Sequence, residues 1–289
     1  MFRSFSRLIN TIVYVWRFML KNEDLLILAL LSAIFSGLWV AVSFEYLLPG
    51  FLVALEHVDG TNWPHVVAVP LLFFIILHFL YLFFSATIIH VAKERISGQK
   101  ISIFEGINHM YARIPGLIGW MLMSLLVGFL LSLLESHSRT RRIVASVLQV
   151  SWSMISLMVL PIMVCEGVGP IKAIKNSMSL IKNTWRIWLG PGIIFLVLFA
   201  LVGFVVVGLS YLWLFFFAPQ ADLGLLFEHI STLLSPGTWA AILVALLLVM
   251  YLFSMMYKSV FGAYVYLALK NPTLLKDKDH VLIERAMGK

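Results

Sequence analysis

Residues 242–250 read Ile-Leu-Val-Ala-Leu-Leu-Leu-Val-Met, and they lie inside an apolar stretch that extends from 238 to 269. Roughly 20 helical residues are needed to cross the hydrocarbon core of a bilayer. The run does not alternate between polar and apolar residues, as a strand of a membrane barrel does. Lipid cannot satisfy open backbone groups, so a stretch of this kind predicts a transmembrane helix.

Five other stretches of the chain have the same character. The six predicted spans are 25–48, 66–92, 115–134, 143–165, 189–218 and 238–269. Pro49-Gly50 follows the first of them, and we expect that helix to end there. Of the 289 residues, 61% are hydrophobic and 12% are charged. A soluble domain has about 45–50% and about 25% of comparable residues. The composition excludes an ordinary soluble enzyme and predicts an all-α polytopic membrane protein with little mass outside the bilayer.

The Lys and Arg residues are concentrated on one side of these spans. The basic segments on that side are 1–24, 93–114, 166–188 and the tail 270–289. The segments on the other side hold only Arg139, Arg141 and Arg142. Cytoplasmic loops carry such an excess of basic residues, so we expect both termini in the cytoplasm.

Three of the basic segments share a further pattern. In each, apolar residues recur at helical spacing on one face and basic or polar residues lie on another, as in a helix that lies in the headgroup plane. In 166–188 the apolar face includes Ile171, Ile174 and Met178. The chain thus reads as one membrane domain with three possible repeats of an interfacial helix plus a hairpin, at 1–92, 93–165 and 166–269. The alternative is that positive-inside topology alone makes three hairpins resemble one another.

The basic balance, with a formal net charge of +7, predicts a lipid partner rather than a nucleic acid. A Lys or Arg beside anionic lipid gains about 1 kcal/mol, and the chain has no soluble module to read nucleic acid. The candidate headgroup contacts are Arg3, Arg7, Arg17, Lys172, Lys175, Lys182 and Arg186.

Lys258 is an ionisable residue inside the last predicted span. Tyr251, Ser254 and Lys258 fall on one helical face, and Glu166, which follows the fourth span, can pair with the lysine. Such residues usually pair or face a cavity, which suggests a site for an anion. The alternative is that Lys258 extends its stem to the headgroups from near the cytoplasmic end.

The second span contributes two further polar candidates. His78 and Ser85 lie two turns apart on one face and can line a proton path; the alternative is a histidine hydrogen-bonded between helices. The sequence has no phosphate-binding loop, no HExxH and no GxSxG motif. We therefore expect no enzymatic activity, no cofactor and no metal site; the His, Asp and Glu residues of the outer loops match no zinc spacing.

The central stretch from Pro161 to Ser177, followed by Lys182-Asn-Thr-Trp185, is similar to the signature of an uncharacterised family of bacterial polytopic membrane proteins. The stretches Lys21-Asn-Glu-Asp24 and Phe261-Gly-Ala-Tyr264-Val-Tyr266 also resemble that family. The resemblance implies the fold and a bacterial inner-membrane location. More distantly, the layout resembles the membrane domain attached to some glycerophosphodiester phosphodiesterases. Their catalytic barrel has no counterpart here, so their activity is not implied.

Two functions follow as expectations. The first is a membrane-embedded binding or transport component for a small anion or lipid. The second is a non-catalytic scaffold or assembly factor that binds partner helices, as a homo-oligomer or with another membrane protein, and grips anionic lipid.

Overall fold

A computed structural model describes residues 13–56, 63–135, 139–182, 200, 203–204, 208 and 236–270 of the chain. These residues are almost entirely helical, which confirms the all-α polytopic architecture. The chain divides into two compact units, one formed by residues 1–185 with 255–289 and the other by residues 186–254.

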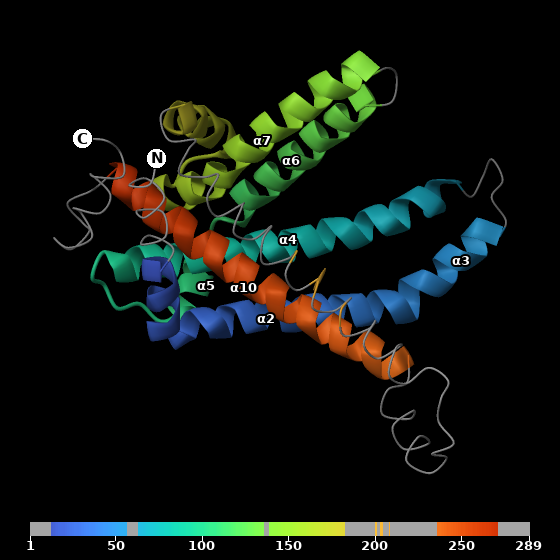
Figure 1. Ribbon diagram of the computed structural model, residues 1–289, viewed down its shortest axis with the longest axis horizontal. Coiled ribbons are helices and arrows are strands. Elements are labelled where there is room, and N and C mark those ends of the chain that lie inside the picture. The colour runs from blue at the N-terminus through green and yellow to red at the C-terminus, as the bar shows by residue number, and fades with distance from the viewer. Residues whose placement is uncertain are drawn as a thin grey trace, which may run out of the picture. The chain divides into compact units, whose positions relative to one another are not determined.

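The first unit holds most of the described helices. They are α2 (Glu23–Val42), the π-helix η1 (Ser43–Leu47), α3 (Leu48–Glu56), α4 (Trp63–Ile96), α5 (Ile103–Tyr111), α6 (Ile114–Glu135) and α7 (Arg139–Glu166), together with helical residues 13–21 and 170–182. The last helix, α10 (Pro236–Lys270), contributes its residues from 255 onward. Within this unit α2 packs along α4, and α6 packs along α7 (Figure 1).

Among the described residues, five helical stretches are long and apolar enough to cross a membrane. They are Glu23–Val53, Val66–Ile96, Ile114–Leu134, Arg142–Glu166 and Met250–Lys270. These match the predicted spans 25–48, 66–92, 115–134, 143–165 and 238–269. The remaining predicted span, 189–218, falls outside the described residues apart from four helical positions, so the number six stays a prediction. The three-repeat division also stays a prediction.

The expected end of the first helix at Pro49-Gly50 is wrong. The helix continues through both residues to Glu56. The π-helix η1 lies directly before Pro49, and its closing bond runs from the Leu48 N–H to the Ser43 carbonyl. Proline lacks the N–H that an α-helix would direct at residue 45. A π-turn changes the bonding pattern at that point, so the helix accommodates the proline and is not ended by it.

The core of the first unit lies where its helices meet at one end. We call this the basic end: α2 and α6 begin there, and α4, α7 and α10 end there. Its buried side chains include Leu28 of α2, Ile88 of α4, Met158 of α7 and Tyr264 of α10. At two glycines the helices approach each other closely. A Cβ on Gly106 would lie 2.6 Å from Val91, and one on Gly262 would lie 2.8 Å from the Pro161 ring.

The turns at the basic end are set by left-handed glycines. Gly98 (φ +89°) follows α4, with bonds from its N–H to Arg95 and from Gln99 N–H to Glu94, the Schellman arrangement. Gly167 (φ +68°) follows α7 and donates to the Met163 carbonyl. α5 begins at a capping box, in which Ser102 Oγ accepts from the Glu105 N–H and the Glu105 carboxylate accepts from the Ser102 N–H. These turns bring polar side chains of several helices together at the basic end.

Candidate functional site

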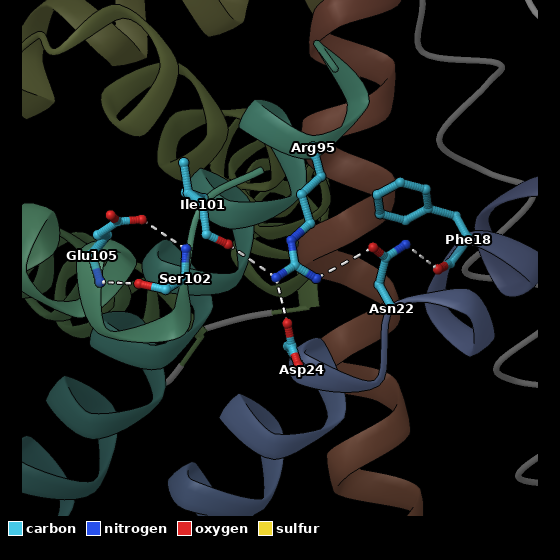
Figure 2. A network of polar contacts seen from close by, with 7 residues as sticks. All are labelled: Phe18, Asn22, Asp24, Arg95, Ile101, Ser102 and Glu105. Carbon is cyan, nitrogen blue, oxygen red and sulfur yellow. Dashed lines mark hydrogen bonds and ion pairs between the residues drawn. The ribbon is translucent and has the colours of Figure 1, made fainter. Parts of the chain in front are cut away.

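The first polar cluster at the basic end centres on Arg95, in the last turn of α4. Its guanidinium contacts the Asp24 carboxylate at 2.5 Å, the Asn22 side-chain oxygen at 3.3 Å and the Ile101 carbonyl at 3.1 Å (Figure 2). Asn22 in turn donates to the Phe18 carbonyl at 2.7 Å. The arginine therefore joins the segment that enters α2 to the turn that leads into α5, a cross-link between elements more than 70 residues apart.

The second polar cluster centres on Glu166, the last residue of α7. Its carboxylate accepts from Asn176 Nδ2 at 2.6 Å and from the Tyr266 hydroxyl at 3.1 Å, and it lies 3.5 Å from Lys270 Nζ. One carboxylate thus connects α7, the helical residues 170–182 and the end of α10.

A stacked histidine pair joins α4 to α5. The rings of His90 and His109 are 4.0 Å apart with 5° between their planes. Burial and the nearby Arg113 and Lys93 lower the pKa of His109, and Glu94 opposes that shift. His109 is consequently neutral near pH 7, since its ordinary pKa is already about 6.5. Neutral rings can stack without the repulsion that two imidazolium ions would bring.

A cavity of about 200 Å³ lies between α5, α6 and the turn after α7. Three glycines (Gly116, Gly167 and Gly169), apolar side chains of the three helices and the Arg113 guanidinium line it. Arg113 Nη1 donates to the Met163 carbonyl at 3.3 Å. A Cβ on Gly167 would lie 2.9 Å from that nitrogen, so glycine keeps the space the guanidinium occupies.

The structure separates the predicted pair of Glu166 and Lys258. The ammonium that meets the Glu166 carboxylate is that of Lys270. Lys258 lies twelve residues earlier on α10, a rise of roughly 18 Å at 1.5 Å per residue. Its side chain is exposed between buried neighbours. The predicted pairing of Glu166 with Lys258 is therefore wrong, and the lysine that pairs with Glu166 is Lys270.

The other intramembrane candidates keep their predicted helical positions. α10 is continuous through Tyr251, Ser254 and Lys258, which preserves their spacing on one face. On α4, His78 is half-buried and stacks on Tyr81 with ring centroids 6.5 Å apart, and Ser85 is buried. Whether these residues form a site stays a prediction.

The candidate headgroup residues fall in three groups. Arg17, Lys172, Lys175 and Lys182 are exposed on helical residues of the first unit. Arg3, Arg7 and Arg186 lie outside the described residues. The described part of the chain contains no group of three His, Cys, Asp or Glu side chains able to hold a metal ion.

Sequence reasoning missed four residues that matter here: Arg95, Arg113, Asn176 and Lys270. From the sequence, the two arginines were interpreted only as charges that fix the topology. Their position beside a predicted span was a signal that they contact other parts of the protein, because a cation at that depth has few partners other than those the fold provides.

The structure brings together stretches on which the family resemblance rests. Gly262 packs against Pro161, and the Tyr266 hydroxyl donates to the Glu166 carboxylate. The model of a family of unknown function, DUF6159, matches residues 65–272. The chain therefore belongs to that family. No curated protein and no solved structure matches it.

Proposed function

We propose that this member of the family is a non-enzymatic membrane protein that binds anionic lipid headgroups, as a binding or transport component for lipid or a small anion. The observation that carries the proposal is the exposed surface of helical residues 170–182. Ile171 is 62% exposed and Met178 46% exposed, and Lys172 and Lys175 are exposed beside them. An apolar row next to a basic row is the surface that a helix presents to the headgroup layer.

The opposite face of the same helix is fixed to the protein. Ala173 and Ser177 are fully buried, and Ser177 Oγ donates to the Ile155 carbonyl of α7 at 2.6 Å. This attachment supports a role for Ile171 and Met178 outside the core, because the helix already has a protein-facing side. A lysine beside an anionic leaflet contributes about 1 kcal/mol, so Lys172, Lys175 and Lys182 together supply a few kcal/mol.

We also propose that the basic end lies at the cytoplasmic face of a bacterial inner membrane and that both termini are cytoplasmic. The distribution of Lys and Arg between the two sides of the spans supports it. In a Cys165→Ser background, Asn62→Cys should react with an impermeant thiol reagent added outside cells, and Lys278→Cys should not. The reverse labelling would overturn the orientation.

The lipid proposal is tested by removing charge at the proposed surface. We expect K172Q/K175Q/K182Q to lower the ratio of anionic to zwitterionic lipid that co-purifies with the protein by at least about fivefold, the effect of losing one contact near 1 kcal/mol. The matched control is R139Q/R141Q/R142Q, which removes three basic residues at the other end of α7. Equal lipid ratios in the two triple variants would contradict the proposal.

A scaffold is the second candidate function. α2 carries Ala33, Gly37 and Ala41 at four-residue spacing on one face, and a Cβ placed on Gly37 would meet no atom of the described residues within 4 Å outside its own stretch of helix. Small residues at this spacing let a second helix approach closely. Gly37→Leu separates the two functions: loss of a homo-oligomer or of a co-purifying membrane protein, with the lipid ratio unchanged, would favour the scaffold.

A further inference from the structure

We propose that the cavity beside Arg113 binds a phosphate group, either the headgroup of an anionic phospholipid or inorganic phosphate. The inference rests on the proposed function and deepens it by giving the anion a specific site. The cavity is about 200 Å³, which is below the roughly 300–1,000 Å³ of a typical small-molecule pocket. Its size therefore suits a single headgroup-sized ion.

Arg113 supplies the charge. It is the charged residue among those that line the cavity, and its guanidinium carries five N–H donors. Within the described residues it donates one hydrogen bond, to the Met163 carbonyl, and has no carboxylate in ion-pair range. The remaining donors can meet a phosphate in the forked geometry that guanidinium and phosphate share.

The surrounding charges favour an anion. Arg113 brings positive charge to the place where α4 meets the α5–α6 turn, where burial and this charge together lower the pKa of the His109 ring. The two nearby carboxylates already have partners. Glu94 contacts Lys93 Nζ at 2.9 Å, and Glu166 lies 3.5 Å from Lys270 Nζ. Neither carboxylate therefore neutralises Arg113.

The backbone around the cavity leaves room for the ion. Among the described residues, a Cβ on Gly169 would meet no atom within 4 Å beyond its chain neighbours, and one on Gly116 would meet the flexible Met163 side chain at 3.6 Å. Gly116 also lies in the first turn of α6, where the helix dipole presents its positive end.

The position along the membrane normal fits a headgroup. Arg113 comes directly before the apolar stretch Ile114–Leu134, and Gly167 comes directly after Arg142–Glu166. α6 and α7 run antiparallel, so both residues lie at the same end of the hairpin. This is the level at which a bilayer places its phosphates, whereas Ile171 and Met178 can rest on the apolar chains below.

The test is calorimetric titration of the full chain in a non-ionic detergent with three probes. They are dihexanoyl phosphatidic acid, inorganic phosphate and dihexanoylglycerol, which lacks the phosphate. We expect phosphatidic acid to bind and dihexanoylglycerol not to bind. Binding of inorganic phosphate as well would assign the site to phosphate in general; its failure alone would assign the site to the lipid headgroup. Binding of neither phosphate probe, or equal binding of dihexanoylglycerol, would overturn the proposal.

Variants then place the binding at Arg113. Arg113→Gln should weaken binding at least tenfold, and Arg142→Gln, the matched control at the other end of the hairpin, should leave it unchanged. Arg113→Lys keeps the charge without the fork and should show an intermediate loss, which covers the case in which the glutamine variant does not fold. Unchanged binding in both Arg113 variants would overturn the site.

The two proposals fail separately. If K172Q/K175Q/K182Q lowers the anionic lipid ratio while Arg113→Gln leaves phosphate binding intact, the lipid-binding surface stands and the cavity site falls. If the triple variant has no effect while Arg113→Gln abolishes phosphate binding, the cavity stands and the surface proposal falls.

Discussion

The two halves of α4 have nearly the same hydrophobic character and opposite surroundings. From Val66 to Tyr81 no described residue is buried, and Phe74 is 63% exposed. From Leu82 to Ala92 every residue except Phe83 is buried. The first half leaves its apolar side chains partly or largely exposed on the surface of the unit, and the second half buries them against other helices. Hydrophobicity therefore places a segment in the membrane and does not say what it contacts there.

Small residues mark the difference. The second half of α4 includes Ser85, Ala86 and Thr87, and Gly106 of α5 packs against Val91. Helices in a bilayer gain from close van der Waals contact rather than from escaping water, so small side chains at the contact decide which segments pack. The basic end has such contacts, and the first half of α4 is bulky and aromatic.

The largest expected effect contrasts these halves with one substitution. Phe84 is 5% exposed and packs against Phe35 with the ring centroids 5.8 Å apart and 31° between the ring planes. We expect Phe84→Ala to lower the free energy of unfolding by about 3 kcal/mol, the range for a buried phenylalanine. Phe74→Ala is the matched control and should change it by less than about 0.5 kcal/mol. Detergent unfolding of both variants measures this, and equal losses would remove the distinction between the halves.

A second contrast adds volume instead of removing it. Gly262→Ala puts a methyl group 2.8 Å from the rigid Pro161 ring, so we expect a loss of about 2 kcal/mol from overpacking. Gly128→Ala, where nothing lies within 4 Å, should instead stabilise α6 by up to about 1 kcal/mol through helix propensity. The same unfolding measurement should therefore give changes in the free energy of unfolding of opposite sign for the two variants. A stabilising Gly262→Ala would show that α7 and α10 are not in contact.

The polar contacts of the basic end should matter less than its packing. Arg95→Gln removes the link to Asp24, and we expect a loss of about 1–2 kcal/mol because the guanidinium is largely buried while the carboxylate is about half exposed. Lys100→Gln, an exposed residue of the turn after α4, serves as the control and should have no measurable effect. A loss as large as that of Phe84→Ala would mean that electrostatics rather than packing holds this end together.

The smallest effect is the coupling of Glu166 to its cation. A double-mutant cycle of Glu166→Gln with Lys270→Gln should give a coupling energy of about 0.5 kcal/mol, because Lys270 is 42% exposed. The same cycle with Lys258→Gln should give none. A coupling to Lys258 in place of Lys270 would contradict the arrangement of α7 and α10.

Four of the five described spans were readable from the sequence to within about five residues, and the fifth, Met250–Lys270, falls within its longer predicted span except at its last residue. The partners of the polar residues were not readable. The boundary at Pro49-Gly50 failed because a π-helix can carry a proline through a helix whose backbone has no water to compete for it. The pairing of Glu166 with Lys258 failed because span positions do not show how α7 and α10 are offset along their length or rotated against each other. Lys270, twelve residues and roughly 18 Å further along α10, is the lysine that reaches the end of α7.

The same limit applies to Arg95 and Arg113. Both are basic residues beside a span, and both indicate the same topology. In the structure Arg95 bonds to Asp24, Asn22 and the Ile101 carbonyl, while Arg113 lines a cavity and, among the described residues, donates only to the Met163 carbonyl. Their roles differ through their neighbours, which come from segments distant in the chain.

The sequence by itself determined the helical class, the positions of most of the spans along the chain and the end of the helices at which the basic residues gather. It could do so because the bilayer imposes length, hydrophobicity and internal hydrogen bonding on each segment separately. Only the tertiary structure decided which half of α4 is buried, which lysine meets Glu166 and where a cavity remains beside Arg113. These depend on how helices of nearly uniform hydrophobicity pack against each other, and that packing is set by side-chain shape at contacts between segments far apart in the chain.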